Sequence, residues 1–378
     1  MKKAVRLLAI ALAVIMLVSM AGCGEDLTGK IVIGGIGPLT GTASTYGQSV
    51  RNGAQIAIDE INAAGGVNGV QLALVFEDDE ADGTKAKSAY ETLMDKGMDI
   101  LVGAVTSGAS VSLNDLILKD GILQITPSAS QIEAAQNPNS FRVCFTDPLQ
   151  GVAMAEYAYN TLGYKSVAII HNHDDDYSTG MYNAFVERYK QLGGKIAEDV
   201  SFSKDATDFS AQMTKIAAAD ADFLYMPIYA EKAAQIVITA NEKGVNLPLV
   251  GGDGLDGILN YLTGDNAKLV EGLIYLTPFV STDESAKIQA FTETYTKKYG
   301  QAPDQFAADG YDAVYLAKLA LEKAGVTSAD AIDNAALVAA MQEIEYEGLT
   351  GKMTFDANGE PQKGAKVAKI VNGIYVAQ

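Results

Sequence analysis

The sequence is short of the residues that most often carry catalysis or covalent cross-links, since its 378 residues include only two cysteines and two histidines. Two cysteines cannot build the disulfide framework of a small exported protein, so the fold depends on its hydrophobic core. Two histidines leave few options for acid–base catalysis, and no nucleophile elbow, P-loop, zinc motif or Cys/His pair occurs. Paired carboxylates stay open as a hydrolytic set because acids are abundant. We nevertheless expect a protein that is not an enzyme.

Positive charge is also scarce. The chain has 28 Lys and Arg residues against 47 Asp and Glu residues, which gives a formal net charge of −19 at pH 7. A surface of this sign repels phosphate backbones, so we expect no nucleic acid as a partner.

Two clusters contain metal-ligating residue types but lack the spacing of a metal site. Residues 77–82 hold five carboxylates in six residues, without the spacing and glycine of an EF-hand loop. We interpret them as a solvated acidic loop that caps a helix beginning at Thr84. His171 and His173 stand beside three aspartates, but no helical histidine pair or cysteine pair supports a zinc site. The sequence therefore predicts no metal and no cofactor.

Long apolar runs are missing, except in the leader. Three basic residues precede an apolar run over residues 7–18, and small residues then lead to Cys23. This order is typical of a secretory signal, and the run is too short to span a bilayer comfortably. A cysteine directly after Ala-Gly resembles a bacterial lipobox. We predict that residues 1–22 are removed, that Cys23 is lipidated, that residues 23–30 form a tether, and that the protein lies on the extracellular face of the cell membrane.

An ordinary signal peptide with an incidental cysteine is the alternative, because Met20 stands where a lipobox usually has Leu. With Cys23 lipidated, Cys144 has no partner, and we expect it to be a small buried hydrophobic residue.

After the leader, short apolar runs alternate with amphipathic segments. A predicted strand at residues 31–36 and a helix at 48–64 form the first unit, and the rhythm restarts later with a strand at 166–170 and a helix at 181–192. Repeated strand–helix units predict an α/β protein with doubly wound parallel sheets and right-handed crossovers. Two similar lobes facing one another would share a cleft.

Polar residues follow several of the predicted strands. The strands at 101–105 and 122–125 each end in a cluster of small hydroxyl residues, and Tyr229 and Asp253 follow later strands. Ligands of open parallel sheets bind outside the carboxyl ends of the strands, where helix N-termini expose N–H groups. Hydroxyls and N–H groups suit a carboxylate, an acid suits an ammonium, and aromatic rings suit an apolar side chain. This inventory predicts a site for a zwitterion.

Four segments resemble one protein family: IGPLTGTASTYGQSVRNGAQIAIDEINAAGGVNG, GILQITPSAS, FLYMPIY and GGDG. They are similar to the bacterial extracellular receptors for branched-chain amino acids that serve ABC importers, and the resemblance covers the chain after residue 30. It implies the type I periplasmic-binding-protein fold, with two doubly wound parallel-sheet lobes joined by three crossover segments. The implied lobes are residues 31–146 plus 278–350 and residues 147–277 plus 351–378.

The resemblance also implies roles for individual residues. Ser107 and Ser130 would hold the ligand carboxylate, the backbone of Ser128 would lie beside the α-carbon, and Asp253 would neutralise the ammonium. The positions that match the family's side-chain pocket are Tyr46, Tyr177, Tyr229 and Phe306. Many relatives have Glu in place of Asp253, so the ammonium sits differently here or uses a water. The alternative is that the serines are helix caps and the aromatic residues belong to the core or the surface.

The implied function is capture of an amino acid, most simply Leu, Ile or Val, by two closing lobes. The receptor would act as a monomer and deliver the amino acid to permease subunits and their ATPases. Three alternatives remain: a sensory ectodomain of the same fold, a receptor for another amino acid or an amide, and a secreted α/β enzyme.

Overall fold

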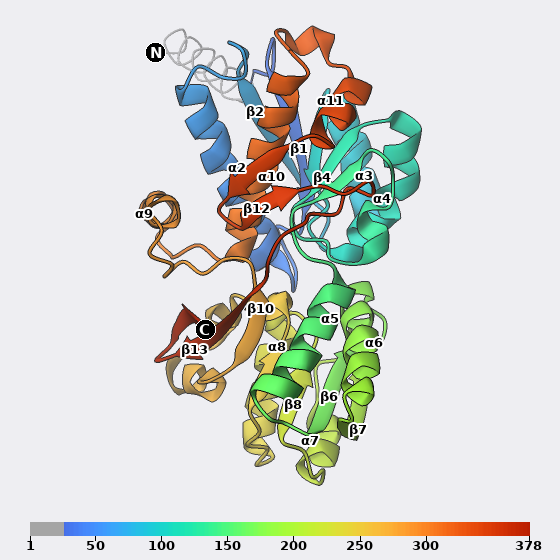
Figure 1. Cartoon of the computed structure of the whole chain (residues 1–378), viewed down its shortest axis with the longest axis vertical. Coiled ribbons are helices and arrows are strands. Elements are labelled where there is room, and N and C mark those ends of the chain that lie inside the picture. The colour runs from blue at the N-terminus through green and yellow to red at the C-terminus, as the bar shows by residue number, and fades with distance from the viewer. Residues whose placement is uncertain (1–25) are drawn as a thin grey trace, which may run out of the picture.

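The computed structural model describes residues 26–378, which form two lobes arranged along the long axis of the molecule (Figure 1). The predicted leader and Cys23 lie outside the described residues. Within residues 26–378, no helix is long and apolar enough to cross a membrane.

The first lobe is built on a five-stranded parallel sheet with the strand order β2-β1-β3-β4-β5. Its strands are β1 (Ile31–Gly37), β2 (Leu72–Asp78), β3 (Ile100–Gly103), β4 (Leu123–Thr126) and β5 (Ser140–Arg142). The helices of this lobe are α2 (Ser44–Ala63), α3 (Gly83–Asp95), α4 (Ser107–Asp120), α9 (Ala286–Tyr299), α10 (Gln305–Lys323) and α11 (Asn334–Met341). Every residue of β1, β3 and β4 is buried, as expected for parallel strands covered on both faces.

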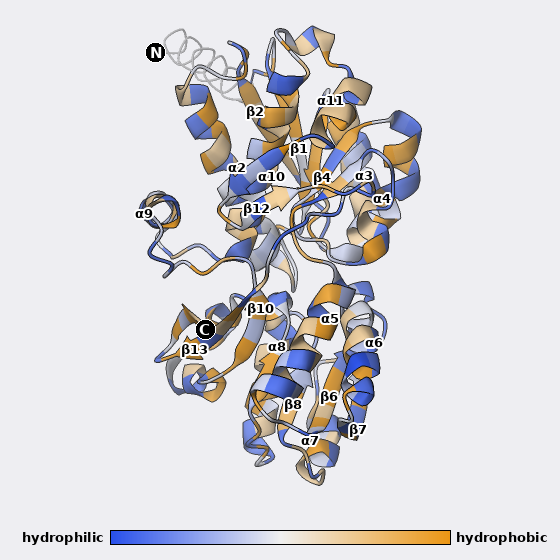
Figure 2. Ribbon diagram, in the orientation of Figure 1, coloured by the Kyte–Doolittle hydropathy of each residue, from blue (hydrophilic) through white to orange (hydrophobic). Residues whose placement is uncertain are grey.

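The second lobe is built on a seven-stranded sheet with the order β14-β13-β10-β9-β8-β6-β7. Its strands are β6 (Ser166–Asn172), β7 (Lys195–Phe202), β8 (Phe223–Met226), β9 (Leu249–Gly251), β10 (Ile274–Thr277), β13 (Lys366–Val371) and β14 (Ile374–Ala377). Its helices are α5 (Asp147–Glu156), α6 (Asp176–Gln191), α7 (Ser210–Ala217) and α8 (Ala230–Glu242). In Figure 2 the strands β6 and β8 are mostly hydrophobic, whereas the outer turns of α6 are hydrophilic.

The two sheets share one topology. The parallel strands of the second lobe run β7-β6-β8-β9-β10, so their chain order across the sheet repeats that of β2-β1-β3-β4-β5. In each lobe the order reverses between the first strand and the third, and a parallel sheet binds ligands outside its carboxyl ends at such a switch point. The repeated rhythm seen in the sequence is therefore a repeated architecture.

Close contact between α2 and α10 fixes the elements that flank the cleft in the first lobe. A side chain at Gly53 would come within 1.8 Å of the Ala307 carbonyl oxygen, and one at Gly310 within 2.4 Å of the Val50 carbonyl oxygen. Only glycine allows the two helix backbones to approach this closely. The contact brings the first turn of α2 beside the first turn of α10.

The acidic segment at residues 77–82 caps a helix as predicted, but it is not a fully solvated loop, because Asp78 ends β2 and Asp79 is fully buried. The side chain of Asp82 is the N-cap of α3 and accepts hydrogen bonds from the N–H groups of Thr84 at 2.9 Å and Lys85 at 3.0 Å. A carboxylate satisfies the free N–H groups of a first helical turn and interacts favourably with the helix dipole. Cys144 is buried, also as predicted.

The chain passes between the sheets three times, and the third passage differs from the prediction. The predicted boundary between residues 350 and 351 falls inside a hairpin, in which β11 (Glu345–Gly348) pairs with β12 (Gly351–Thr354). The hairpin packs in the first lobe, because Met353 belongs to its core and Phe355 contacts Phe141 edge to face. The chain joins the second sheet only at β13. A hairpin pattern is visible in sequence, but the sheet against which it packs is not.

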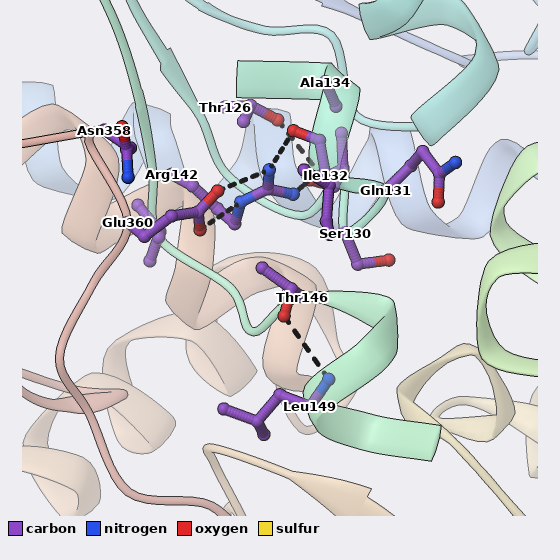
Figure 3. A network of polar contacts seen from close by, with 12 residues as sticks. Thr126, Ser130, Gln131, Ile132, Ala134, Arg142, Thr146, Leu149, Asn358 and Glu360 are labelled. Atoms are coloured by element: carbon purple, nitrogen blue, oxygen red, sulfur yellow. Dashed lines mark hydrogen bonds and ion pairs between the residues drawn. The ribbon is translucent and has the colours of Figure 1, made fainter. Parts of the chain in front are cut away.

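Arg142, at the end of β5, anchors the third crossover to the first lobe (Figure 3). Its side chain is fully buried and forms a two-pronged ion pair with Glu360, at 2.8 and 2.9 Å. The remaining guanidinium donors bind the carbonyl oxygens of Ala129 and Ile132. One buried cation therefore links β5, the loop after β4 and the third crossover.

Replacing Glu360 by Gln is expected to lower the free energy of unfolding by about 3 kcal/mol, because it leaves the buried Arg142 charge without a counter-charge. Urea unfolding followed by circular dichroism measures the change. The matched control is Asp265→Asn, which breaks the exposed Lys268–Asp265 pair and should leave unfolding unchanged. Equal effects of the two variants would contradict a structural role for the buried pair.

Candidate functional site

A cavity between the lobes is lined by residues that follow strand ends in both sheets. In this closed arrangement its free volume is only about 10 Å³, room for about one water molecule and far below the several hundred Å³ typical of small-molecule sites. Its lining consists of Tyr46, Val105, Thr106, Ser128, Tyr177, Tyr229, Asp253, Gly254 and Phe306. The first lobe contributes Tyr46, Val105, Thr106, Ser128 and Phe306, and the second lobe contributes Tyr177, Tyr229, Asp253 and Gly254.

Six of the eight residues predicted to bind the ligand line this cavity: Tyr46, Ser128, Tyr177, Tyr229, Asp253 and Phe306. The two that do not are Ser107 and Ser130, each 1% exposed. These two are bonded to each other, because the Ser107 hydroxyl oxygen accepts from the N–H groups of Ser130 at 3.1 Å and Gln131 at 3.2 Å.

The loop after β4 is held from several directions. The Ser128 hydroxyl donates to the carbonyl oxygen of Val105 at 2.8 Å, which ties the loop to the end of β3. On the opposite side, Arg142 binds the backbone carbonyls of Ala129 and Ile132, which flank Ser130 (Figure 3). The loop that carries Ser128 and Ser130 is therefore held in place by contacts within the protein, which lowers the ordering cost of binding a ligand.

Four aromatic rings form one continuous wall of the cavity. The ring centroids of Tyr46 and Phe306 are 4.4 Å apart, and those of Tyr46 and Tyr229 are 5.4 Å apart. Tyr177 stacks on Tyr229 at 4.8 Å. The rings come from α2 and α10 in the first lobe and from α6 and the start of α8 in the second. This wall offers an apolar surface that exists only when the lobes are together.

Asp253 begins a short 3₁₀ turn (Asp253–Leu255) directly after β9 and is 2% exposed. Burial raises its pKa to about 6, and the polar side chains of Tyr177, Gln150 and Gln305 oppose the shift. Its Oδ1 atom has no hydrogen-bond partner among the described residues. A buried carboxylate oxygen without a partner is costly, so this atom is suited to accept from a cationic donor on a ligand.

Gln150 and Gln305 support Asp253, and sequence reasoning missed both. The Gln150 side-chain oxygen accepts from the Asp253 backbone N–H at 3.0 Å, and the Gln305 oxygen accepts from the Thr277 hydroxyl at 2.8 Å. Both side-chain nitrogens are buried and lack partners among the described residues. Neither residue directly follows a strand, so a search for polar residues at strand ends does not find them.

Thr106 is a further lining residue outside the predicted set. Its hydroxyl is buried and has no partner in the described part of the chain. The signal was present, since Thr106 belongs to the hydroxyl cluster that follows β3, but only Ser107 of that cluster was assigned a role. The structure turns Thr106 toward the cavity and Ser107 toward the neighbouring loop.

The two sequence clusters with metal-ligating residue types have other partners. His171 stacks on Tyr182 at 3.9 Å, and its Nδ1 atom lies 3.5 Å from an Asp199 carboxylate oxygen. Within residues 26–378, no group of three or more His, Cys, Asp or Glu side chains is arranged to hold a metal ion.

The sequence profile of the periplasmic binding protein family matches residues 30–373. Leu/Ile/Val-binding protein homolog 3 of Brucella melitensis is 30% identical over 334 residues, which cover 87% of this chain and 88% of the relative.

Two solved structures are similar over almost all of the chain. LivJ of Streptococcus pneumoniae, a branched-chain amino acid transporter substrate binding protein in complex with isoleucine, has a TM-score of 0.84 at 32% identity. That match covers 92% of this chain and all of LivJ. The leucine binding protein LivK of Thermotoga maritima has a TM-score of 0.83 at 29% identity and covers 92% of this chain and 97% of LivK.

Both the fold and the sequence thus agree with the resemblance seen in the sequence. Two parallel-sheet lobes joined by three crossovers form the type I periplasmic-binding-protein fold. The chain belongs to the periplasmic binding protein family.

Proposed function

We propose that the protein captures Leu, Ile or Val between its lobes and delivers it to the transmembrane permease of an ABC importer. Asp253 carries the proposal, because its unpartnered buried oxygen shares an interlobe cavity with an aromatic wall. A free amino acid with an apolar side chain supplies an ammonium for the Asp253 carboxylate and an apolar group for the aromatic wall. The Leu/Ile/Val-binding relative and the isoleucine complex of LivJ support this ligand class.

The proposal assigns the ligand carboxylate to the loop after β4 and the first turn of α4. Ser107 accepts two backbone N–H bonds, so its hydroxyl hydrogen is still free to donate. Thr106 adds a hydroxyl that lines the cavity, and the backbone N–H of Ser130 donates to the Ser107 hydroxyl behind it. The backbone carbonyl of Ser128 is assigned to the ammonium, together with Asp253.

The apolar side chain of the ligand is assigned to Tyr46, Tyr177, Tyr229 and Phe306. Complete burial of a Leu, Ile or Val side chain contributes about 1.5–3 kcal/mol. Because the rings come from both lobes, this contribution requires closure. We infer a hinged closure of two units, residues 31–146 with 278–361 and residues 147–277 with 366–378.

Membership of a solute-binding family implies a periplasmic or extracellular location. We infer further that the chain is anchored by a lipid on Cys23, acts as a monomer, and docks on permease subunits driven by their ATPases. A sensory ectodomain is the second candidate, and a chromosomal neighbour encoding a permease rather than a kinase distinguishes the two. We infer that no reaction takes place on the ligand, so mass spectrometry should recover the bound amino acid unchanged.

Asp253→Asn is expected to weaken leucine binding at least a hundredfold, because it removes the counter-charge of the buried ammonium. Titration calorimetry measures the dissociation constants of the variant and of wild type for leucine. The same measurement on wild type with each of the twenty amino acids should show the tightest binding for Leu, Ile and Val. Asp205→Asn serves as the control, because it removes the same charge from an exposed position that does not line the interlobe cavity. If wild-type protein binds no amino acid, or Asp253→Asn binds normally, the zwitterion assignment is wrong.

The affinity for leucine should depend on pH through Asp253. Its pKa of about 6 means that the carboxylate is ionised above pH 6 and becomes neutral below it. The dissociation constant should therefore be about tenfold higher at pH 5 than at pH 8, because only the ionised fraction binds the ammonium well. Calorimetry on Asp253→Asn should show no such step, and an identical step in that variant would assign it to another group.

Cys23→Ser is expected to release the protein from the membrane, because the substitution removes the thiol that the lipid modifies. Partition of an expressed chain between membrane and medium measures this. An unmodified Cys23 in the mass spectrum of the mature wild-type protein would favour the ordinary signal peptide.

A further inference from the structure

The first turn of α2 reaches across the cleft and bonds to the other lobe. The Tyr46 hydroxyl donates to the Gly254 carbonyl oxygen at 2.8 Å and accepts from the Ala230 N–H at 2.7 Å. Nearby, the Thr45 hydroxyl bonds to the Tyr261 hydroxyl at 2.8 Å. In Figure 1, α2 belongs to one lobe and α8, which begins at Ala230, to the other. These hydrogen bonds join the lobes directly.

Helix α8 has no cap of its own. Its N-cap residue is Tyr229, which makes no side-chain capping bond. The first N–H groups of a helix have no partner inside the helix, and a buried one must find a partner elsewhere. Ala230 is fully buried, and the partner of its N–H is Tyr46, from the opposite lobe. When the lobes separate, this N–H group and the Gly254 carbonyl both lose that partner.

We propose that Tyr46 is a closure latch, whose hydroxyl caps helix α8 across the cleft and thereby stabilises the closed form. This proposal rests on the proposed function only where it concerns the amino acid ligand. A contact that exists only in the closed form raises the population of that form, and the apparent affinity rises with the population that can bind. Tyr46 therefore acts on binding in two ways, through its ring at the cavity and through its hydroxyl across the lobes.

The hydroxyl and the ring of Tyr46 can be tested separately. Its ring lies 4.4 Å from that of Phe306 and 5.4 Å from that of Tyr229, and a phenylalanine would keep both contacts. Burial holds the pKa of Tyr46 well above its usual value, so the hydroxyl keeps its proton and remains a donor. Tyr46→Phe removes only the latch.

Three Tyr→Phe variants separate a latch from a ligand contact and from general loss of stability. Tyr46→Phe loses two buried interlobe hydrogen bonds. Tyr261→Phe loses the Thr45 contact, which lies outside the cavity lining. Tyr189→Phe is the control, because the Tyr189 hydroxyl donates to the Tyr164 carbonyl oxygen within the second lobe.

Leucine calorimetry and stopped-flow dissociation should show a dissociation constant about tenfold higher for Tyr46→Phe and about threefold higher for Tyr261→Phe. Both increases should come from faster dissociation, and Tyr189→Phe should match wild type. The latch is overturned if Tyr46→Phe binds within twofold of wild type. It is also overturned if Tyr46→Phe weakens binding while Tyr261→Phe matches the control, because the hydroxyl would then act on the ligand alone.

Small-angle scattering of the ligand-free chains tests the latch independently of any ligand. Tyr46→Phe should have a larger radius of gyration than wild type and Tyr189→Phe, and equal radii overturn the proposal. If wild-type protein binds none of Leu, Ile and Val, the proposed function fails, and the scattering result still decides whether Tyr46 holds the lobes together.

Discussion

The burial of the Asp253 carboxylate is the constraint on which the ligand site depends. A carboxylate that is 2% exposed must be neutralised, hydrogen-bonded or protonated, because burial of an uncompensated charge is costly. The fully buried Arg142 of the first lobe is already engaged, since it pairs with Glu360. The side chains of Tyr177, Gln150 and Gln305 already lower the pKa of Asp253, and in the proposed function a cation on the ligand compensates its charge further.

The repeated sheet topology brings the required groups to one place. In each lobe the strand order reverses beside the first strand, and the loops at that switch point face the other lobe. Hydroxyls and N–H groups come from the ends of β3 and β4, whereas the acid and one tyrosine come from the ends of β9 and β8. Neither lobe carries both halves of the chemistry. The acid, the hydroxyls and the complete aromatic wall are therefore brought together only when the lobes meet.

Rigid and movable connections lie close together at the junction of the lobes. Arg142 and Glu360 hold the third crossover and the loop around Ser130 to the first lobe, so this part is expected to move as one body. The hydrogen bonds of Tyr46, by contrast, exist only between lobes. A firm backbone beside the cavity reduces the ordering cost of binding, while the interlobe hydrogen bonds favour the closed form.

The sequence by itself determined the fold class and most of the residues that line the interlobe cavity, because both depend largely on local patterns. Alternating apolar runs and helices predict parallel sheets, strand-end residues such as Ser128, Tyr229 and Asp253 must lie at one edge of a sheet, and the family resemblance added Tyr46, Tyr177 and Phe306. Only the tertiary structure decided that Thr106 faces the cavity while Ser107 faces the loop, and that the β11–β12 hairpin packs in the first lobe. It also decided that Gln150 and Gln305 lie beside Asp253, and that Tyr46 caps a helix more than 180 residues away in the chain. These features depend on which surfaces meet after folding, and the spacing of residues along the chain does not predict such long-range contacts.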